Sequence, residues 1–225
     1  MKIVTAEFIS SVVELRKCPE PDRPEYAFAG RSNVGKSSLL NMITNHTGLA
    51  KISGRPGKTQ TINHFVINKP RTGVGESWYM VDLPGYGFAK VNLATKAKWE
   101  RFIHNYILKR DSLLCVFVLI DSRLDPQQND LDFMAFLATK EIAFVMVFTK
   151  CEKLSATKLN NALKKYNDKL LEEWEELPRM FFTSAYDKKG KEELLAFVAE
   201  TNKTFVAMPP TADEYADKIK SRIVK

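Results

Sequence analysis

Short runs of apolar residues alternate along this chain with longer segments in which apolar residues recur every three or four positions. The short runs predict six β-strands, at residues 25–30, 61–67, 77–82, 113–121, 142–150 and 180–184. The longer segments predict helices at residues 37–45, 95–110, 128–140, 156–174 and 191–203. Such alternation is typical of an α/β fold, so we expect a mostly parallel six-stranded sheet with helices on both faces.

Turn-forming residues between positions 68 and 77 separate the second and third predicted strands. They favour a hairpin, which would make one edge strand antiparallel. The length of the chain fits one domain with extensions. We expect this domain over residues 25–203, an N-terminal extension over 1–24 that packs on it, and a basic tail over 204–225 with a helix at 211–224.

Composition narrows the class of protein. The chain has 44% hydrophobic and 27% charged residues, as soluble globular proteins do. Its longest apolar runs, 113–120 and 142–148, are too short to span a bilayer. The N-terminal stretch is interrupted by Glu7 and Glu14 and has no small-residue cleavage site, so we expect a cytoplasmic protein without a secretory signal or a membrane partner.

Cysteine and histidine residues are few and scattered. Cys18, Cys115 and Cys151 are odd in number and lack the spacing of metal ligands, so we expect free thiols in a reducing compartment. The three histidines are equally dispersed. No metal site built from these residue types is therefore expected.

The first candidate site is the stretch GRSNVGKSS, which contains G-x-x-x-x-G-K-[ST] between a predicted strand and a predicted helix. In such a loop successive backbone N–H groups turn toward phosphate oxygens, and the helix N-terminus adds to the attraction. Lys36 would reach the β- and γ-phosphates, and the Ser37 hydroxyl would bind Mg²⁺. The candidate nucleotide-binding residues are Gly30, Arg31, Ser32, Asn33, Val34, Gly35, Lys36 and Ser37.

A second candidate, D-x-x-G, ends the third predicted strand with Asp82, Leu83, Pro84 and Gly85. A carboxylate at this position can hold Mg²⁺ through a water molecule. The Gly85 N–H can contact a γ-phosphate and so respond to its presence. Paired with the upstream phosphate loop, the four residues predict a nucleotide-sensing turn.

Two later stretches would recognise the base. The residues TKCE approximate the [NT]-K-x-D motif, whose carboxylate accepts hydrogen bonds from N1–H and the 2-amino group of guanine while the lysine stem lies along the purine ring. After the last predicted strand, an S-A element would present a backbone N–H to guanine O6. The candidate base-binding residues are Thr149, Lys150, Cys151, Glu152, Thr183, Ser184 and Ala185.

The loop before the second predicted strand is rich in Gly, Pro and Thr. A threonine hydroxyl there can ligate Mg²⁺ only while γ-phosphate is bound, which orders the loop in one state and releases it in the other. Thr59 is our choice for this metal ligand, with Thr61 as the alternate. The candidate segment comprises Gly57, Lys58, Thr59, Gln60 and Thr61.

The stretches GRSNVGKSSLLN, PGKTQTIN, DLPGYGFAKV and DSRLDPQQND closely resemble the EngB family of bacterial GTPases, also called YihA or YsxC. The resemblance covers about residues 3–202, and PGYGFAKV is its most specific part. It implies a Ras-like P-loop GTPase fold, GTP or GDP with Mg²⁺, and a role in assembling the large (50S) ribosomal subunit, with septation and cell-division defects on loss. Two residues depart from the family pattern: Glu152 replaces the usual Asp, and Leu124 replaces a common His.

Catalysis of phosphoryl transfer depends on positioning and charge neutralisation, so the expected catalytic residues are Lys36, Thr59 and Gly85. Tyr86 stands where Ras-type enzymes place the glutamine that orients water. We therefore expect slow intrinsic hydrolysis that a partner or a monovalent cation accelerates. Asn33 resembles the asparagine with which potassium-dependent relatives hold K⁺; the alternative is a loop-capping role.

The net charge of +7 favours an anionic partner, although solvated surface charge would also account for it. Together with the resemblance, the charge makes ribosomal RNA of the large subunit or its precursors the expected partner of a monomeric switch. Two other functions use the same phosphate loop. A metabolite kinase should have an arginine-bearing lid and no guanine-reading element, and a scaffold would bind GTP without turning it over.

Overall fold

The computed structural model describes residues 1–50, 61–69, 77–86 and 93–206. In this part of the chain seven strands form one sheet in the order β1-β3-β4-β2-β5-β6-β7. The strands are β1 (Ala6–Val12), β2 (Glu25–Gly30), β3 (Ile62–Ile67), β4 (Trp78–Asp82), β5 (Leu113–Asp121), β6 (Phe144–Thr149) and β7 (Met180–Phe182). The helices are α1 (Lys36–Thr44), α2 (Leu93–Lys109), α3 (Gln128–Thr139), α4 (Ala156–Leu171) and α5 (Lys191–Thr201). The predicted tail helix at 211–224 lies outside the described residues.

The central strands β4, β2, β5, β6 and β7 run parallel to one another. Every residue of β2 is buried, as is all of β5 after its first two residues. Strands that are covered on both faces read as continuous apolar runs, which is why these elements could be predicted from the sequence. The mostly parallel α/β sheet is confirmed.

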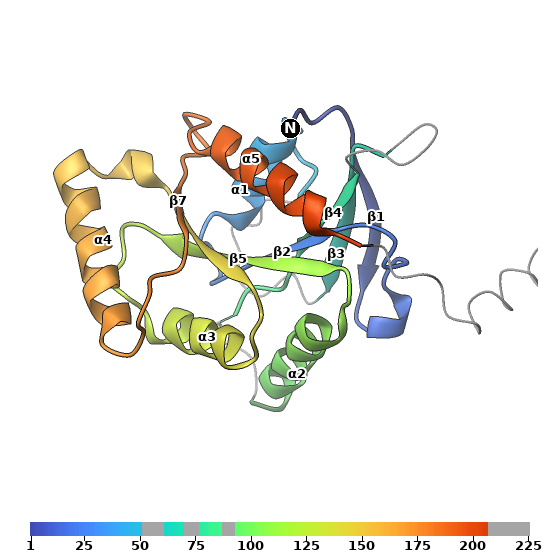
Figure 1. Cartoon of the computed structure of the whole chain (residues 1–225), viewed down its shortest axis with the longest axis horizontal. Helices are drawn as coiled ribbons and strands as arrows, with labels where there is room; N and C mark the ends of the chain where they lie inside the picture. The colour runs from blue at the N-terminus through green and yellow to red at the C-terminus, as the bar shows by residue number, and fades with distance from the viewer. Residues whose placement is uncertain (51–60, 70–76, 87–92, 207–225) are drawn as a thin grey trace, which may run out of the picture.

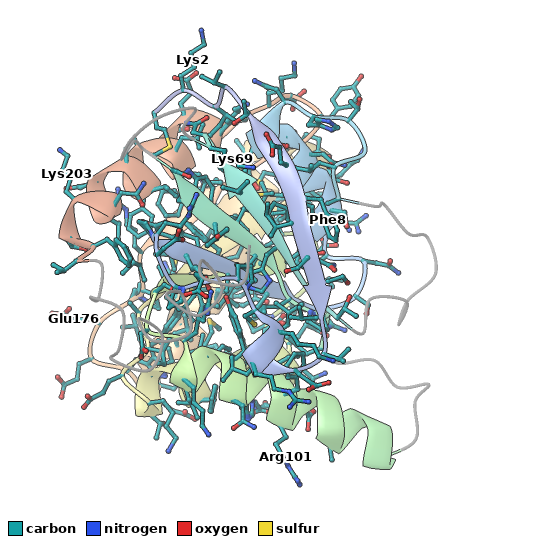
Figure 2. All side chains as sticks on the ribbon, turned by 90° about the vertical axis from the view of Figure 1, so that its right-hand side faces the viewer. Lys2, Phe8, Lys69, Arg101, Glu176 and Lys203 are labelled. Atoms are coloured by element: carbon teal, nitrogen blue, oxygen red, sulfur yellow. The ribbon has the colours of Figure 1, made fainter. Side chains whose placement is uncertain are left out.

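The antiparallel pairing of β3 with β4 is also confirmed, with Asn63 opposite Asp82. The expectation that the hairpin places its antiparallel strand at the edge of the sheet is wrong for β3. The strand β1 pairs antiparallel with the outer side of β3, forms the edge itself and makes the sheet one strand larger than expected. Figure 2 looks onto this edge, with Phe8 on β1. Only Val12 of β1 is buried, so the pairing with β3 specifies this strand more strongly than its own apolar pattern does.

Helices cover both faces of the sheet (Figure 1), as predicted, and an apolar layer lies between each face and its helices. In Figure 1, α1 and α5 lie above the sheet and α2 and α3 lie below it. The upper layer includes Leu40 of α1 and Leu195 of α5, and the lower layer includes Tyr106 of α2 and Met134 of α3. Of the helices that the structure describes, none combines the length and apolar character needed to cross a bilayer.

The carboxyl ends of the parallel strands lie together along one edge of the sheet, which is a different edge from the one formed by β1. Gly30 ends β2, Asp82 ends β4, Asp121 ends β5 and Thr149 ends β6. Ligands of open α/β sheets bind outside the carboxyl ends of the strands, so this edge is where a functional site is expected.

Candidate functional site

The phosphate loop connects the end of β2 directly to α1. Gly35 caps the helix with φ of +107°, and Asn33 has φ of +65°. Glycine adopts this left-handed conformation without steric cost, and asparagine tolerates it better than most residues. The first N–H groups of a helix have no partner within the helix. The loop therefore presents backbone donors and the positive end of the helix dipole at the sheet edge.

Lys36, the first residue of α1, forms an ion pair with Asp82 at the end of β4. Their side chains are only 11% and 7% exposed. The second carboxylate oxygen of Asp82 accepts a hydrogen bond from Asn63 Nδ2 at 3.4 Å. The Ser37 hydroxyl and the Asp82 carboxylate offer oxygen donors, which suit Mg²⁺.

The turn after β4 packs on the phosphate loop. Leu83 N–H donates to Phe28 O at 3.0 Å, and Tyr86 N–H donates to Gly30 O at 3.2 Å. A Cβ atom on Gly85 would lie 3.2 Å from Ser32 Oγ and 3.3 Å from Gly30 O, so a larger residue would crowd the loop. The close approach explains why this turn ends in glycine, and it brings the Gly85 backbone next to the loop.

The end of β6 fastens the opposite side of the phosphate loop. Thr149 Oγ1 donates to Val34 O at 2.6 Å, and Lys150 Nζ donates to Asn33 O at 2.7 Å. Lys150 has φ of +59°, and its Cε atom lies 3.5 Å from the position of a Cβ atom on Gly35. The lysine stem thus lies along the loop, with its apolar length available to a planar ring.

Asp121 at the end of β5 holds Lys150 in this position. Its Oδ2 atom accepts hydrogen bonds from Lys150 Nζ at 2.8 Å and from Arg123 Nη2 at 2.8 Å. Burial alone would raise the pKa of Asp121, but these hydrogen bonds outweigh burial and lower the pKa to about 2. The carboxylate therefore stays ionised at neutral pH and neutralises part of the charge of two cations.

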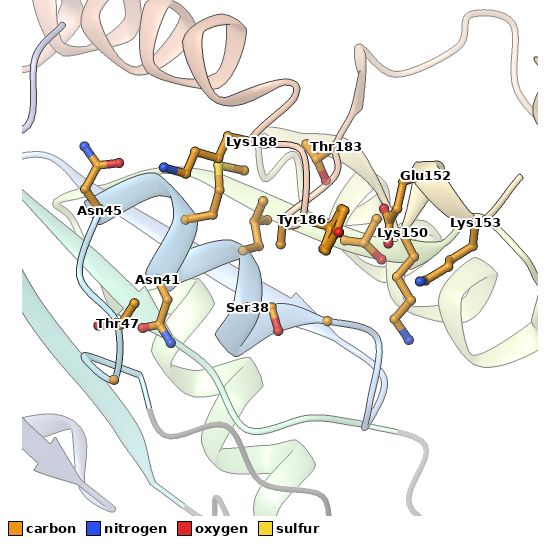
Figure 3. Close-up of a pocket in the computed structure, with 16 residues that line it drawn as sticks. Ser38, Asn41, Asn45, Thr47, Lys150, Glu152, Lys153, Thr183, Tyr186 and Lys188 are labelled. Atoms are coloured by element: carbon orange, nitrogen blue, oxygen red, sulfur yellow. The ribbon is translucent and has the colours of Figure 1, made fainter.

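A cavity of about 860 Å³ opens between α1 and the loops that follow β6 and β7. Figure 3 shows Ser38 and Asn41 of α1 on one side and Lys150, Glu152, Thr183 and Tyr186 on the other. The Oε2 atom of Glu152 is buried and has no hydrogen-bond partner among the described residues. A buried oxygen without a partner is costly, so this carboxylate is suited to a ligand that supplies N–H donors.

The comparisons with known proteins agree with this geometry. A family model described as a 50S ribosome-binding GTPase matches residues 25–150. A curated relative named "Probable GTP-binding protein EngB" from Flavobacterium psychrophilum is 52% identical over 203 residues, which cover 90% of this chain and 96% of the relative. A relative of the same name from Porphyromonas gingivalis is 50% identical over 202 residues, covering 90% of this chain and 97% of the relative.

The chain belongs to the EngB family of GTP-binding proteins. It is a GTPase of the Ras-like P-loop fold, as its resemblance to EngB implied. A crystal structure of a probable GTP-binding protein engB shares the fold with a TM-score of 0.57 and 21% identity, covering 80% of this chain and all of that one. The GTPase Era, in complex with MgGDPNP and a segment of 16S ribosomal RNA, shares it with a TM-score of 0.65 and 20% identity over 84% of this chain and 60% of Era.

In this EngB protein the loops at 30–37, 82–85, 149–152 and 183–185 meet at one edge of the sheet. Cys151 N–H donates to Thr183 O at 3.2 Å and joins the last two loops. The side chains of Val34, Leu83 and Cys151 belong to the apolar core, so these residues could reach a ligand only through their backbone.

The predicted metal-binding loop of this EngB protein falls largely outside the described residues. Gly57, Lys58, Thr59 and Gln60 are among the residues that are not described. The alternate, Thr61, is described: its hydroxyl accepts a hydrogen bond from Ser11 at 2.7 Å and donates to Asn63 Oδ1 at 3.1 Å. Through Asn63, Thr61 connects to Asp82 and so to the phosphate loop.

Sequence reasoning assigned no site role to Asp121, Arg123 or Asp130 of this EngB protein. A signal for Asp121 was available, because a carboxylate that ends a buried central strand lies at the ligand-binding edge of the sheet. Its pairing with Lys150 depends on the adjacency of β5 and β6. No local pattern marked Asp130, which lies in the first turn of α3 and is buried.

Proposed function

We propose that this EngB-family GTPase is a nucleotide-operated switch in the assembly of the large ribosomal subunit, and that normal septation and cell division depend on it. The observation that carries the nucleotide site is the convergence of four loops on one sheet edge. Glu152, whose Oε2 atom is buried without a partner among the described residues, lines the cavity beside the phosphate loop. GTP or GDP would be held by residues 30–37 and 82–85, and guanine by residues 149–152 and 183–185.

In this proposal Lys36 exchanges one anionic partner for another. Its ammonium group pairs with Asp82 in the structure and would move to the β- and γ-phosphates on nucleotide binding. Mg²⁺ would then bind Ser37 and Thr59, with Asp82 reaching it through water, and would neutralise phosphate charge. The Gly85 N–H would contact the γ-phosphate and register its loss on hydrolysis.

Hydrolysis would be slow without an activator. Tyr86 occupies the position after Gly85, and its phenol cannot orient an attacking water as a glutamine amide does. Asn33 has an exposed side chain and positive φ, which leaves it free to hold K⁺; the same backbone conformation fits a loop-capping role. Multiple-turnover release of phosphate in K⁺ and in Na⁺ separates these roles, and it also separates a hydrolysing switch from a scaffold that only binds GTP.

Three observations support the ribosomal partner. The matching family model is described as a 50S ribosome-binding GTPase, Era was crystallised with ribosomal RNA, and this chain carries a net charge of +7. We place the GTPase domain at residues 25–203, with an extension at 1–24 packed on it and a basic tail at 204–225. We propose that the protein acts in the cytoplasm as a monomer.

Co-sedimentation with ribosomal particles in GTP, in GDP and without nucleotide tests the switch. We expect nucleotide-dependent binding that weakens steeply with salt, because phosphate contacts release counterions. Lys36→Ala and Ser37→Ala should lose both nucleotide affinity and the nucleotide dependence of co-sedimentation. The exposed Lys158 on α4 provides the control variant Lys158→Ala. Particle binding that ignores both salt and nucleotide would refute the ribosomal role, and normal hydrolysis by both loop variants would refute the site.

A further inference from the structure

Tyr86 links the phosphate loop to α3. Its backbone N–H donates to Gly30 O at 3.2 Å, and its main chain forms a parallel bridge with Arg31. Its ring lies 4.8 Å from the ring of Phe133 on α3, with the planes inclined by 35°. The residue that follows the turn at 82–85 is therefore attached to two different elements, and a shift of Gly85 would be passed on to its side chain.

The Tyr86 hydroxyl is buried beside the carboxyl group of Asp130, which is 2% exposed in the first turn of α3. Neither Tyr86 Oη nor Asp130 Oδ1 has a hydrogen-bond partner within the described part of the chain. Burial raises the pKa of Asp130 to about 6, while the Tyr86 hydroxyl and the Arg31 charge act against this rise. A buried donor and a buried acceptor thus lie next to each other. They are close enough for the Tyr86 hydroxyl to lower the pKa of Asp130, yet the Tyr86 hydroxyl oxygen has no partner of full hydrogen-bond geometry, which is costly for buried groups.

The surroundings of Asp130 offer its carboxyl group few other partners. Arg31 faces it from the phosphate loop, Tyr86 from the turn after β4, and Tyr166 from α4. The hydroxyl of Tyr166 is also buried and unpartnered in the region that the structure describes. Asp130 borders a cavity of about 240 Å³ with the charged residues Arg31, Asp121, Arg123 and Lys150. Of these, Asp121 is already bonded to Arg123 and Lys150.

We propose that Asp130 is a positioning residue that accepts a hydrogen bond from the Tyr86 hydroxyl in one nucleotide state and releases it in the other. An ionised carboxylate is a stronger acceptor than a neutral group, so the pairing would anchor Tyr86 and, through it, the backbone of Gly85. This inference rests on the proposed contact between Gly85 and the γ-phosphate. If the two are coupled, the nucleotide must alter the protonation equilibrium of Asp130, and protonation must alter nucleotide preference by the same factor.

The direct test is a ¹³C NMR titration of the Asp130 carboxyl group in the full chain, with GDP and with a non-hydrolysable GTP analogue. We expect the two complexes to give Asp130 pKa values that differ by about half a unit or more. Tyr86→Phe should abolish this difference and raise the pKa in the complex in which the hydrogen bond forms. Equal pKa values in the two complexes, or a difference that persists in Tyr86→Phe, would overturn the inference.

Affinity measurements supply the reciprocal readout. The change in the ratio of affinities for the analogue and GDP between pH 5 and pH 7 should differ about threefold between the unmodified protein and Asp130→Asn, matching half a pKa unit. Titration of the nucleotide phosphates is common to both proteins and cancels in this comparison. The exposed Asp132 on the same helix provides the control variant Asp132→Asn, which should behave as the unmodified protein does. Loss of all nucleotide binding in the unmodified chain would contradict the proposed function instead. Normal binding with the same pH dependence of the ratio in the unmodified protein and in Asp130→Asn would contradict only the role of Asp130.

Discussion

Lys150 Nζ donates a hydrogen bond to Asp121 Oδ2 at 2.8 Å, which joins the ends of two neighbouring strands beneath the phosphate loop. The same ammonium group donates to Asn33 O at 2.7 Å. The lysine that is expected to lie along the purine ring is therefore held by a carboxylate on one side and by the phosphate loop on the other. Its position depends on β5 as well as on its own motif.

Asp121→Asn should lower the free energy of unfolding. It should also weaken nucleotide binding, because Asp121 holds Lys150 in position. The pKa of Asp121 is about 2 in the folded chain against an ordinary 3.8, so its ionised form adds about 2 kcal/mol of stability. This contribution is complete above about pH 4 and is lost as the pH falls through about 2.

Urea unfolding at pH 7 should show that the unmodified protein is more stable than Asp121→Asn by roughly this amount. The gap in stability between the two proteins should be smaller at pH 3. Asp125→Asn, in an exposed ion pair with Lys165, is the control. A gap that did not change with pH would show that the charge of Asp121 is unimportant.

Asp82→Asn should separate the two roles of this carboxylate. In the structure Asp82 holds Lys36, so removing its charge frees the ammonium group for phosphate. We expect GDP to bind several-fold more tightly without Mg²⁺, because a buried ion pair no longer has to be broken. The gain in affinity on adding Mg²⁺ should shrink, because the carboxylate that helps to hold the metal is lost. Calorimetric titration with GDP, with and without Mg²⁺, measures both effects. Weaker GDP binding in the absence of Mg²⁺ would contradict the competition between Asp82 and phosphate for Lys36.

Glu152→Gln should weaken guanine binding selectively. The substitution can replace an acceptor oxygen with a donor facing the guanine N–H groups, leaving a desolvated mismatch of about 1 to 3 kcal/mol. GDP should then bind roughly ten- to a hundredfold more weakly, and XDP, with a carbonyl in place of the 2-amino group, should gain relative to GDP. Glu152→Asp should keep the preference for guanine.

Titration of fluorescent GDP, XDP and ADP against these two variants and the unmodified protein measures the base preference. Because Glu152 Oε2 has no partner among the described residues, the Gln variant should retain the unfolding temperature of the parent. Unchanged GDP affinity in that variant would mean that Glu152 does not contact the base. Equal competition by ADP would exclude guanine recognition altogether.

His64→Leu should make folding less sensitive to acid. His64 on β3 is fully buried, neither ring nitrogen has a partner in the described structure, and burial lowers its pKa from 6.5 to about 3. Below about pH 6.5 His64 is therefore protonated in the unfolded chain but stays neutral in the folded chain. The free energy of unfolding falls by up to about 1.4 kcal/mol for each pH unit, down to about pH 3. Unfolding curves between pH 7 and pH 4 should be flatter for this variant. His46→Leu, at an exposed position, should retain the slope of the parent, and an equal slope in His64→Leu would contradict the assignment.

The strands of the parallel core and the phosphate loop could be predicted from the sequence because their causes are local. A strand such as β5, covered on both faces, is a continuous apolar run, and the loop at 30–37 carries its glycines, lysine and serine in one stretch. The strand β1 was missed because most of its side chains are exposed and its partner β3 lies about 50 residues further along the chain.

The sequence by itself determined the class of fold, the phosphate-binding chemistry and the kind of base to expect, since each follows from residues that are neighbours in the chain. Only the tertiary structure decided that Lys36 pairs with Asp82, that Asp121 holds Lys150, and that Tyr86 meets Asp130. These relationships join residues 29 to 46 positions apart, and they arise because parallel strands and the helices that cover them bring different parts of the chain to one sheet edge. Burial then sets their energies, because a charge removed from water must find its partner within the fold.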